Sequence, residues 1–413
     1  MHKILAALAA LLVLAPAARA QSLDVAASFN GTDGANPEAG LTDVNGTLYG
    51  TTYGGGANGE GTIFSYGATG GITTLASFNG TDGAGPRAGL TDINGTLYGT
   101  TYGGGANGDG TIFSYSAANG LTTLASFNGA NGTDPLAGLT DINGTLYGTT
   151  FFGGTNGDGT LFSYSAEKGL TTLASFNGVA TGSAPQSGLT DVNGTLYGTT
   201  YGGGANGNGT IFSYNAATGL TNVASFDGAD GNLPRAGLTA VNGTLYGTTF
   251  YGGANGVGTL FSYSAANGLT ALASFNNASG ANPEAGLIDV SGTLYGTASD
   301  GGANGDGTLF SYSAANGLTT LASFNGANGA NPLAGLTAVN NTLYGTTVNG
   351  GANIAGVLFS YQLPNAAVPE PASIALLATG AALLALGRRR GRSGAFQGLS
   401  PAARADDPGR GDR

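Results

Sequence analysis

Cysteine is missing from this 413-residue sequence, and histidine occurs once, as His2. Without cysteine the chain forms no disulfides and offers no thiolate ligand to a metal. Cysteine and histidine are also the side chains most often used as nucleophile and general base near neutral pH. We therefore expect a protein that is not an enzyme, with no catalytic residues, no metal site and no cofactor.

Basic residues are scarce as well. Between residues 21 and 365 the chain has three, Arg87, Lys168 and Arg235, against 19 acidic residues, an excess of 16 negative charges. A nucleic-acid partner needs a basic patch that displaces phosphate counterions, and an anionic membrane surface attracts basic segments. This composition predicts neither partner and suits an extracellular surface of Gly, Asn, Thr and Ser.

Long apolar runs are also lacking, and the first short one lies at the N-terminus. Lys3 precedes an apolar run from Ile4 to Ala15, and Ala18-Arg19-Ala20 forms a small-x-small cleavage site. This pattern predicts a signal peptide over residues 1–20, with cleavage after Ala20 and secretion across the inner membrane.

The dominant feature of the sequence is a repeat of about 49 residues. Asn-Gly-Thr-Leu-Tyr-Gly-Thr-Thr and close variants recur seven times, with the tyrosine at Tyr49, Tyr98, Tyr147, Tyr197, Tyr246, Tyr295 and Tyr344. A period of this length is typical of units that bury their apolar surface only against neighbouring units.

Each unit divides into four short strands. In the second unit they are expected at Ala88–Ile93, Thr96–Thr101, Thr111–Tyr115 and Leu121–Phe127. Asn94-Gly95, between the first two, favours a type I′ turn. Apolar residues do not alternate cleanly with polar ones, as expected for sheets covered on both faces. Radially stacked blades of a β-propeller meet that condition, with the first strand innermost because it begins with small residues.

The two ends of the repeat region complement each other. The seventh unit stops after the third strand (Val357–Tyr361), and Leu23–Phe29 matches a fourth strand without the three that precede it. A ring closed by its own N-terminal strand explains both observations. We expect an all-β, seven-bladed β-propeller of four-stranded blades over residues 21–363.

The repeat pattern, Gly-Leu-x(6)-Leu-Tyr-Gly-Thr-Thr followed by Gly-Gly and Gly-Thr-Ile/Leu-Phe, resembles the GloVer tandem repeat of bacterial surface proteins. It departs from the pattern at Ala298 in unit six and Val357 in unit seven. The resemblance implies an exported protein of the cell envelope or extracellular matrix and brings no catalytic residues.

Residues 364–390 resemble a PEP-CTERM sorting signal. Val368-Pro369-Glu370-Pro371 precedes an apolar run from Ala372 to Leu386, followed by Arg388-Arg389-Arg390. The apolar run of 15 residues is short for a bilayer, which needs roughly 20. It favours a transient transmembrane helix that awaits an exosortase-type enzyme, and a permanent anchor is the alternative. The tail at 391–413 is expected to be disordered.

The Gly-rich loops and the acidic residues before the Asn-Gly turns each allow two interpretations. Gly104–Asp109 and its copies faintly resemble calcium loops, but one carboxylate per loop is few, so turn formation is favoured. A ring of aspartates could bind cations, whereas local turn stabilisation is the simpler role. These aspartates are Asp43, Asp92, Asp141, Asp191 and Asp289.

Aromatic residues at the entrance to the Gly-rich loops are the candidate binding residues. Rings beside Asn and Asp suit stacking on a sugar, although they could instead cover the blade core. The candidates are Tyr53, Tyr102, Phe152, Tyr201 and Tyr251. Two functions remain open: a non-catalytic display or structural propeller, or a glycan-binding module that engages an exopolysaccharide.

Overall fold

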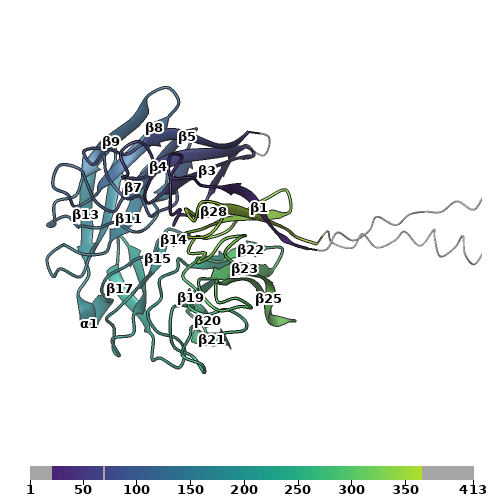
Figure 1. Ribbon diagram of the computed structural model, residues 1–413. Coiled ribbons are helices and arrows are strands. Elements are labelled where there is room, and N and C mark those ends of the chain that lie inside the picture. The colour runs from purple at the N-terminus through teal and green to yellow at the C-terminus, as the bar shows by residue number, and fades with distance from the viewer. Residues whose placement is uncertain (1–20, 68–69, 365–413) are drawn as a thin grey trace, which may run out of the picture. The chain divides into compact units, whose positions relative to one another are not determined.

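The structure is a computed structural model that describes residues 21–67 and 70–364. It is an all-β, seven-bladed β-propeller in which every blade is a four-stranded antiparallel sheet, as the sequence predicted (Figure 1). Blades 1 to 6 are consecutive in the chain, and the compact unit ends at Leu363.

The strands have four positions in a blade, numbered from the first to the fourth. The first strands are β2 (Thr42–Val44), β6 (Thr91–Ile93), β10 (Thr140–Ile142), β14 (Thr190–Val192), β18 (Thr239–Val241), β22 (Ile288–Val290) and β26 (Thr337–Val339). The second strands are β3 (Thr47–Thr52), β7 (Thr96–Thr101), β11 (Thr145–Thr150), β15 (Thr195–Thr200), β19 (Thr244–Thr249), β23 (Thr293–Ala298) and β27 (Thr342–Thr347).

The two remaining positions complete each blade. The third strands are β4 (Thr62–Gly67), β8 (Thr111–Ser116), β12 (Thr160–Ser165), β16 (Thr210–Asn215), β20 (Thr259–Ser264), β24 (Thr308–Ser313) and β28 (Val357–Gln362). The fourth strands are β5 (Gly71–Ser77), β9 (Gly120–Ser126), β13 (Gly169–Ser175), β17 (Gly219–Ser225), β21 (Gly268–Ser274), β25 (Gly317–Ser323) and, in blade 7, β1 (Leu23–Ser28).

Local turn chemistry sets the register of the first hairpin. Asn94 has φ of 54° and Gly95 has φ of 81°, the pair of positive values that a type I′ turn requires. The side-chain Oδ1 of Asp92 accepts a hydrogen bond from the Gly95 N–H at 3.0 Å. The same bond forms at the four equivalent aspartates, the contact that the turn interpretation of these residues expects.

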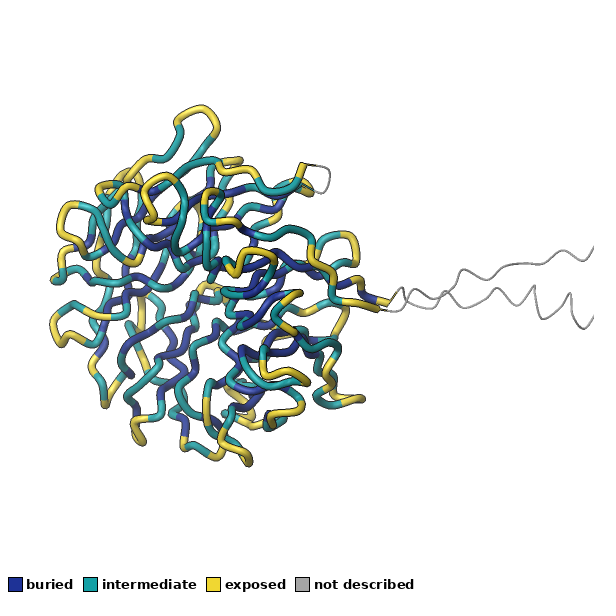
Figure 2. The backbone as a smooth tube through the Cα atoms, viewed as in Figure 1, coloured by how far each residue is buried: buried dark blue, intermediate teal, exposed yellow. Residues whose placement is uncertain are grey.

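Each blade is buried on both faces. Ile112 and Phe113 are adjacent and both fully buried; Phe113 packs against Phe78 of blade 1, and Ile112 packs with Phe127 toward blade 3. A β-bulge in β9 makes the pattern irregular, because Ala125 pairs with Ile112 while Thr123 pairs with Phe113. Figure 2 shows the buried strands inside and the exposed turns at the periphery.

The same contacts recur at all seven interfaces between blades. An edge-to-face phenylalanine pair joins each blade to the next, with ring centroids 4.9 to 5.1 Å apart. A threonine in the second strand donates to a backbone carbonyl of the next unit, as Thr100 Oγ1 does to Ala137 O at 3.1 Å. The interfaces therefore depend on side chains that every repeat supplies.

The N-terminal strand closes the ring. β1 pairs antiparallel with β28, with Leu23 opposite Tyr361 and Ser28 opposite Val357, and the two strands lie side by side in Figure 1. Thr337 Oγ1 in blade 7 donates to Leu41 O in unit one at 2.5 Å. The predicted exchange between the two ends of the chain is confirmed.

The first strand is shorter than predicted, because Ala88, Gly89 and Leu90 lie outside β6. The small residues are nevertheless needed where adjacent units approach each other. A Cβ added to Gly89 would lie 3.4 Å from Gly40 O, in the preceding unit. These residues pack against neighbouring units instead of pairing within their own sheet, which explains the short strand.

One helix departs from the strand pattern. Tyr147 and Tyr197 are 50 residues apart, one more than the other pairs of successive tyrosines, and the extra residue lies in the proline loop of unit four. The single turn α1 (Gly178–Thr181) accommodates it, and Asn177 caps this turn by accepting from the Ala180 N–H at 3.0 Å. Within the described residues no helix has the length and apolar character to cross a bilayer. The signal peptide with Ala18 and Ala20, the sorting signal with its short apolar helix, and the tail lie outside the described residues.

Candidate ligand-binding site

Two kinds of loop meet on one face of the propeller, which we call the loop face. The proline loop connects the fourth strand of one blade to the first strand of the next, and the Gly-rich loop connects the second and third strands. Ala84 in a proline loop and Gly103 in a Gly-rich loop exchange backbone hydrogen bonds of 2.8 and 3.0 Å. The Asn-Gly turns lie on the opposite, turn face.

The residue after the proline of every proline loop contributes to one cavity. These seven residues, the axial ring, are Glu38, Arg87, Leu136, Gln186, Arg235, Glu284 and Leu333. Together with Tyr102 and Phe151 they line a cavity of about 370 Å³, the axial cavity. Because each blade supplies one member, the cavity lies where all seven units converge, on the axis of the propeller. The first strand of each blade is the next element after its member of the axial ring in the chain, so the first strands are the innermost strands.

Two ion pairs span neighbouring members of the axial ring. Arg87 Nη1 lies 3.3 Å from Glu38 Oε2, and Arg235 Nη1 lies 2.9 Å from Glu284 Oε2. Both glutamate side chains are more buried than their arginines. In ring order the glutamates flank Leu333, while the arginines flank Leu136 and Gln186. The cavity therefore has an acidic arc and a basic arc, with no net charge when all four groups are ionised.

Burial shifts the titration of both glutamates. Burial raises the pKa of Glu38 above its ordinary value, although Arg87 lowers it, and Glu284 raises it further. Burial likewise raises the pKa of Glu284; Arg235 acts in the opposite direction, and Asp300 adds to the increase. The neighbouring guanidinium groups thus offset only part of the desolvation of the carboxylates.

Aromatic rings hold both arginines in place. The Arg87 guanidinium carbon lies 4.5 Å from the ring centroid of Tyr53 and 5.1 Å from that of Tyr102. Arg235 lies 5.4 Å from the Tyr201 centroid and 3.9 Å from that of Phe250. These are cation–π distances, so the rings stabilise the guanidinium groups and fix their orientation.

The five aromatic residues singled out in the sequence take two positions. Tyr53, Tyr102 and Tyr201 contact the arginines of the axial ring, and Tyr102 is also 36% exposed. Phe152 and Tyr251 occupy the next position in their loops and are 47% and 43% exposed. Among the described residues, none of the five belongs to the apolar clusters between blades.

Unit six replaces the aromatic residue with Ser299 and follows it with Asp300. Ser299 is buried, and its Oγ donates to Asn282 O at 2.8 Å. The aromatic residues of the loop entrances are thus confined to units one to five, since unit seven has Val348 in this position. The loop face is asymmetric although the blades repeat.

Sequence reasoning missed the axial ring. A usable signal was present, because the proline is constant and the residue after it is not. Both arginines between residues 21 and 365 also occupy this position, Arg87 after Pro86 and Arg235 after Pro234. Their concentration at one variable site in an otherwise regular repeat indicates a shared location.

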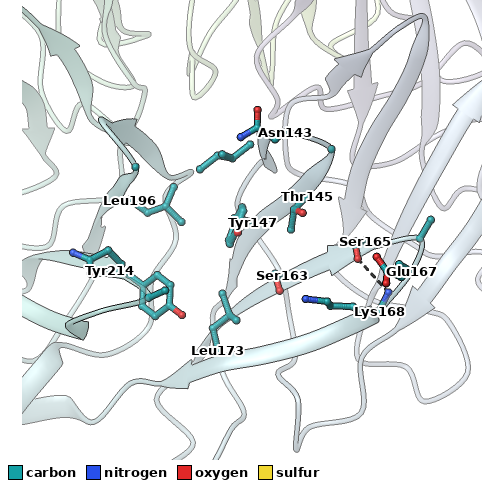
Figure 3. A pocket seen from close by; sticks show the side chains of 16 residues that line it. Asn143, Thr145, Tyr147, Ser163, Ser165, Glu167, Lys168, Leu173, Leu196 and Tyr214 are labelled. Carbon is teal, nitrogen blue, oxygen red and sulfur yellow. Dashed lines mark hydrogen bonds between the residues drawn. The ribbon is translucent and has the colours of Figure 1, made fainter.

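A second cavity, of about 640 Å³, lies on the turn face between blades 3 and 4 (Figure 3). Its lining includes Tyr147, Tyr214 and the hairpin residues Glu167 and Lys168. Smaller grooves of about 150 and 210 Å³ occupy the equivalent position between blades 1 and 2 and between blades 5 and 6. This cavity is thus an enlarged copy of a groove that the repeat itself produces.

Potential metal ligands do not gather in the part of the chain that the structure describes: no group of three or more His, Cys, Asp or Glu side chains lies close enough to hold an ion. Two carboxylates of the Gly-rich loops accept hydrogen bonds from the proline loops instead. Asp158 Oδ2 accepts from the Gly178 N–H at 2.9 Å, and Asp109 Oδ1 accepts from Thr133 Oγ1 at 3.2 Å.

Fold and site together define a seven-bladed propeller with a charged, aromatic-rimmed cavity on its axis. The chain belongs to the Gloeobacter/Verrucomicrobia repeat family, whose sequence profile matches residues 14–212 and 193–382. This match confirms the resemblance of the repeats; the sorting signal remains a prediction. Among curated proteins none matches the chain.

Solved structures with similar folds have very different sequences. The BP39L lectin from Burkholderia pseudomallei superposes with a TM-score of 0.57 at 10% identity, over 82% of this chain and 98% of the lectin. A europium-containing methanol dehydrogenase superposes with a TM-score of 0.50 at 12% identity, over 83% of this chain and 93% of the enzyme. At such identities the likeness shows the fold alone.

Proposed function

We propose that this protein is an exported, non-catalytic propeller that binds a polysaccharide of the cell envelope or extracellular matrix on its loop face. The observation that carries the proposal is the meeting of exposed aromatic rings and a polar cavity on that face. Tyr102, Phe152 and Tyr251 account for three of the six large apolar side chains exposed in the described residues. Tyr102 lines the axial cavity, and Phe152 and Tyr251 are exposed in the Gly-rich loops of blades 3 and 5 on the same face. Exposed apolar groups beside polar ones are typical of binding surfaces.

A sugar ring has apolar faces and a polar rim, and the loop face offers partners for both. Exposed aromatic rings cover the C–H faces, while the charged and amide groups of the axial ring form hydrogen bonds with hydroxyl groups. The proposal includes export through the predicted signal peptide and processing by an exosortase-type enzyme, as residues 1–20 and 364–390 predict. Display without a ligand is the second candidate, favoured by the near-identical blades.

Retention of the full mature chain on a polysaccharide array, including exopolysaccharide from envelope material, tests the proposal. Removing an aromatic contact from the centre of an interface should weaken retention by about tenfold or more, so Tyr102→Ala and Tyr251→Ala should each reduce it. Lys168→Ala on the turn face is the matched control and should bind normally. No retention by the wild type would leave display as the function, and loss with Lys168→Ala alone would assign binding to the turn face.

A further inference from the structure

The axial cavity has a composition that selects among sugars. Its four charged residues form two ion pairs, so a charged ligand group would find each opposite charge already partnered. To bind there, a ligand carboxylate would compete with Glu284 for Arg235 and leave a largely buried carboxylate without its partner. Leaving a buried charge uncompensated is strongly unfavourable.

Each ion pair also places a donor beside an acceptor. A guanidinium group has five N–H donors, and Arg235 uses Nη1 on Glu284. Both arginines contact the Oε2 atom of their glutamate, and among the described residues none donates a hydrogen bond to Glu38 Oε1 or Glu284 Oε1. Each Oε1 atom therefore keeps its capacity to accept. Two neighbouring hydroxyl groups of a sugar match this arrangement, because one oxygen accepts from the arginine while the other hydroxyl donates to the glutamate.

The walls of the cavity match the remaining parts of a sugar ring. Leu136, Leu333, Tyr102 and Phe151 offer apolar contacts to C–H groups, and the Gln186 amide adds one donor and one acceptor site. The volume of about 370 Å³ lies near the lower end of the range for small-molecule pockets, about 300–1,000 Å³. That volume suits one or two sugar units.

The closed ring of blades determines how a polymer reaches this cavity. One residue from every blade forms the wall, so the wall is continuous around the axis. A chain that enters along the axis does so with its end, and its following units then cross the loop face toward exposed rings such as Phe152 and Tyr251.

We propose that the axial cavity binds the terminal unit of an uncharged glycan, whose vicinal hydroxyl groups bond to the Arg87–Glu38 and Arg235–Glu284 pairs. This inference rests on the proposed polysaccharide binding and specifies the part of the ligand that this face recognises. The cavity discriminates against uronic acids and amino sugars because its charges are already paired.

Competition experiments on the full mature chain test the inference. Neutral methyl hexosides should displace a retained polysaccharide, whereas methyl glucuronide and glucosamine should be at least about tenfold weaker. Leu333→Trp, which fills the cavity, should abolish displacement by the hexosides. Lys168→Trp, at an exposed hairpin position on the turn face, is the matched control and should leave displacement unchanged.

The outcomes separate this inference from the proposed function. Absence of polysaccharide retention would refute the proposed function itself. Three results would overturn the axial assignment alone: neutral hexosides displace none of the retained polysaccharide, methyl glucuronide or glucosamine displaces it best, or the hexosides still displace it fully from the Leu333→Trp variant. Glu284→Gln supplies a second measurement, since it leaves one guanidinium unpaired and should shift preference toward methyl glucuronide. An unchanged preference would also contradict the inference.

Discussion

Phe29 provides a direct test of ring closure, because it connects the N-terminal segment to the first blade. It is fully buried, and its ring meets that of Phe64 edge to face at 5.1 Å. Leu41, Leu48, Tyr66 and Leu358 complete the cluster around it, so both ends of the chain contribute. Replacing a buried phenylalanine with alanine costs about 3–5 kcal/mol of folding free energy.

Phe127 is the matched position within the chain. It is also fully buried and meets Phe162 at 5.1 Å, in a cluster with Ile112, Leu139 and Leu146. In a closed ring the two interfaces are equivalent, so Phe29→Ala and Phe127→Ala should lower the free energy of unfolding by similar amounts. In an open array the terminal strand would separate locally, and Phe29→Ala would have much the smaller effect.

Chemical denaturation of the two variants and the wild type measures the difference. The midpoints should fall together, with slopes that stay close to that of the wild type. Size-exclusion chromatography should show association after deletion of residues 21–29, because β28 would then have an unpaired edge. A shift for Phe29→Ala less than half of that for Phe127→Ala would refute the reasoning.

Three further predictions concern local groups and processing. Asp92→Ala should lower the free energy of unfolding by about 0.5–1.5 kcal/mol, because the Gly95 N–H loses its acceptor. The midpoint of chemical denaturation measures this change, and an unchanged midpoint would count against the turn role. Glu284 has a pKa raised by burial above the ordinary value of 4.5, so its contribution to stability is greatest in acid and is lost as the pH rises through the folded-state pKa. As the pH rises through that folded-state pKa, the wild type should therefore lose stability relative to Glu284→Gln. Free energies of unfolding measured at several pH values test this, and equal pH dependence of the two proteins would contradict it. Intact-mass measurement of envelope material should find a species without residues 1–20 and without Arg388–Arg390, and a mature species that retains the arginines would exclude the sorting prediction.

Much of the architecture follows from patterns that repeat locally in the sequence. Asn94-Gly95 fixes a type I′ turn through its backbone preferences, and Thr96–Thr101 forms the second strand with the predicted bounds. Leu124 fits the alternation less well because it falls at a β-bulge. The first strand was overestimated because Gly89 has a packing role between units, which strand patterns do not reveal.

The candidate site was only partly predictable. The aromatic residues at the loop entrances stand out in the sequence, but their pairing with arginines does not. Arg87 lies 34 residues after Tyr53 and 15 before Tyr102, and only the meeting of two adjacent units places it between those rings. The sequence also gives no local sign that Glu38 faces Arg87 across a unit boundary.

The sequence by itself determined the number of blades, the order of strands and the closure of the ring, because each depends on a pattern present within one repeat or missing from one end. Tertiary structure alone decided the chemistry of the axis. Residues such as Glu38 and Glu284 are far apart in the chain, and their charges act on one another only when seven units converge. The physical reason is that repeat contacts are made between neighbouring units, whereas the axial cavity exists only in the completed circle.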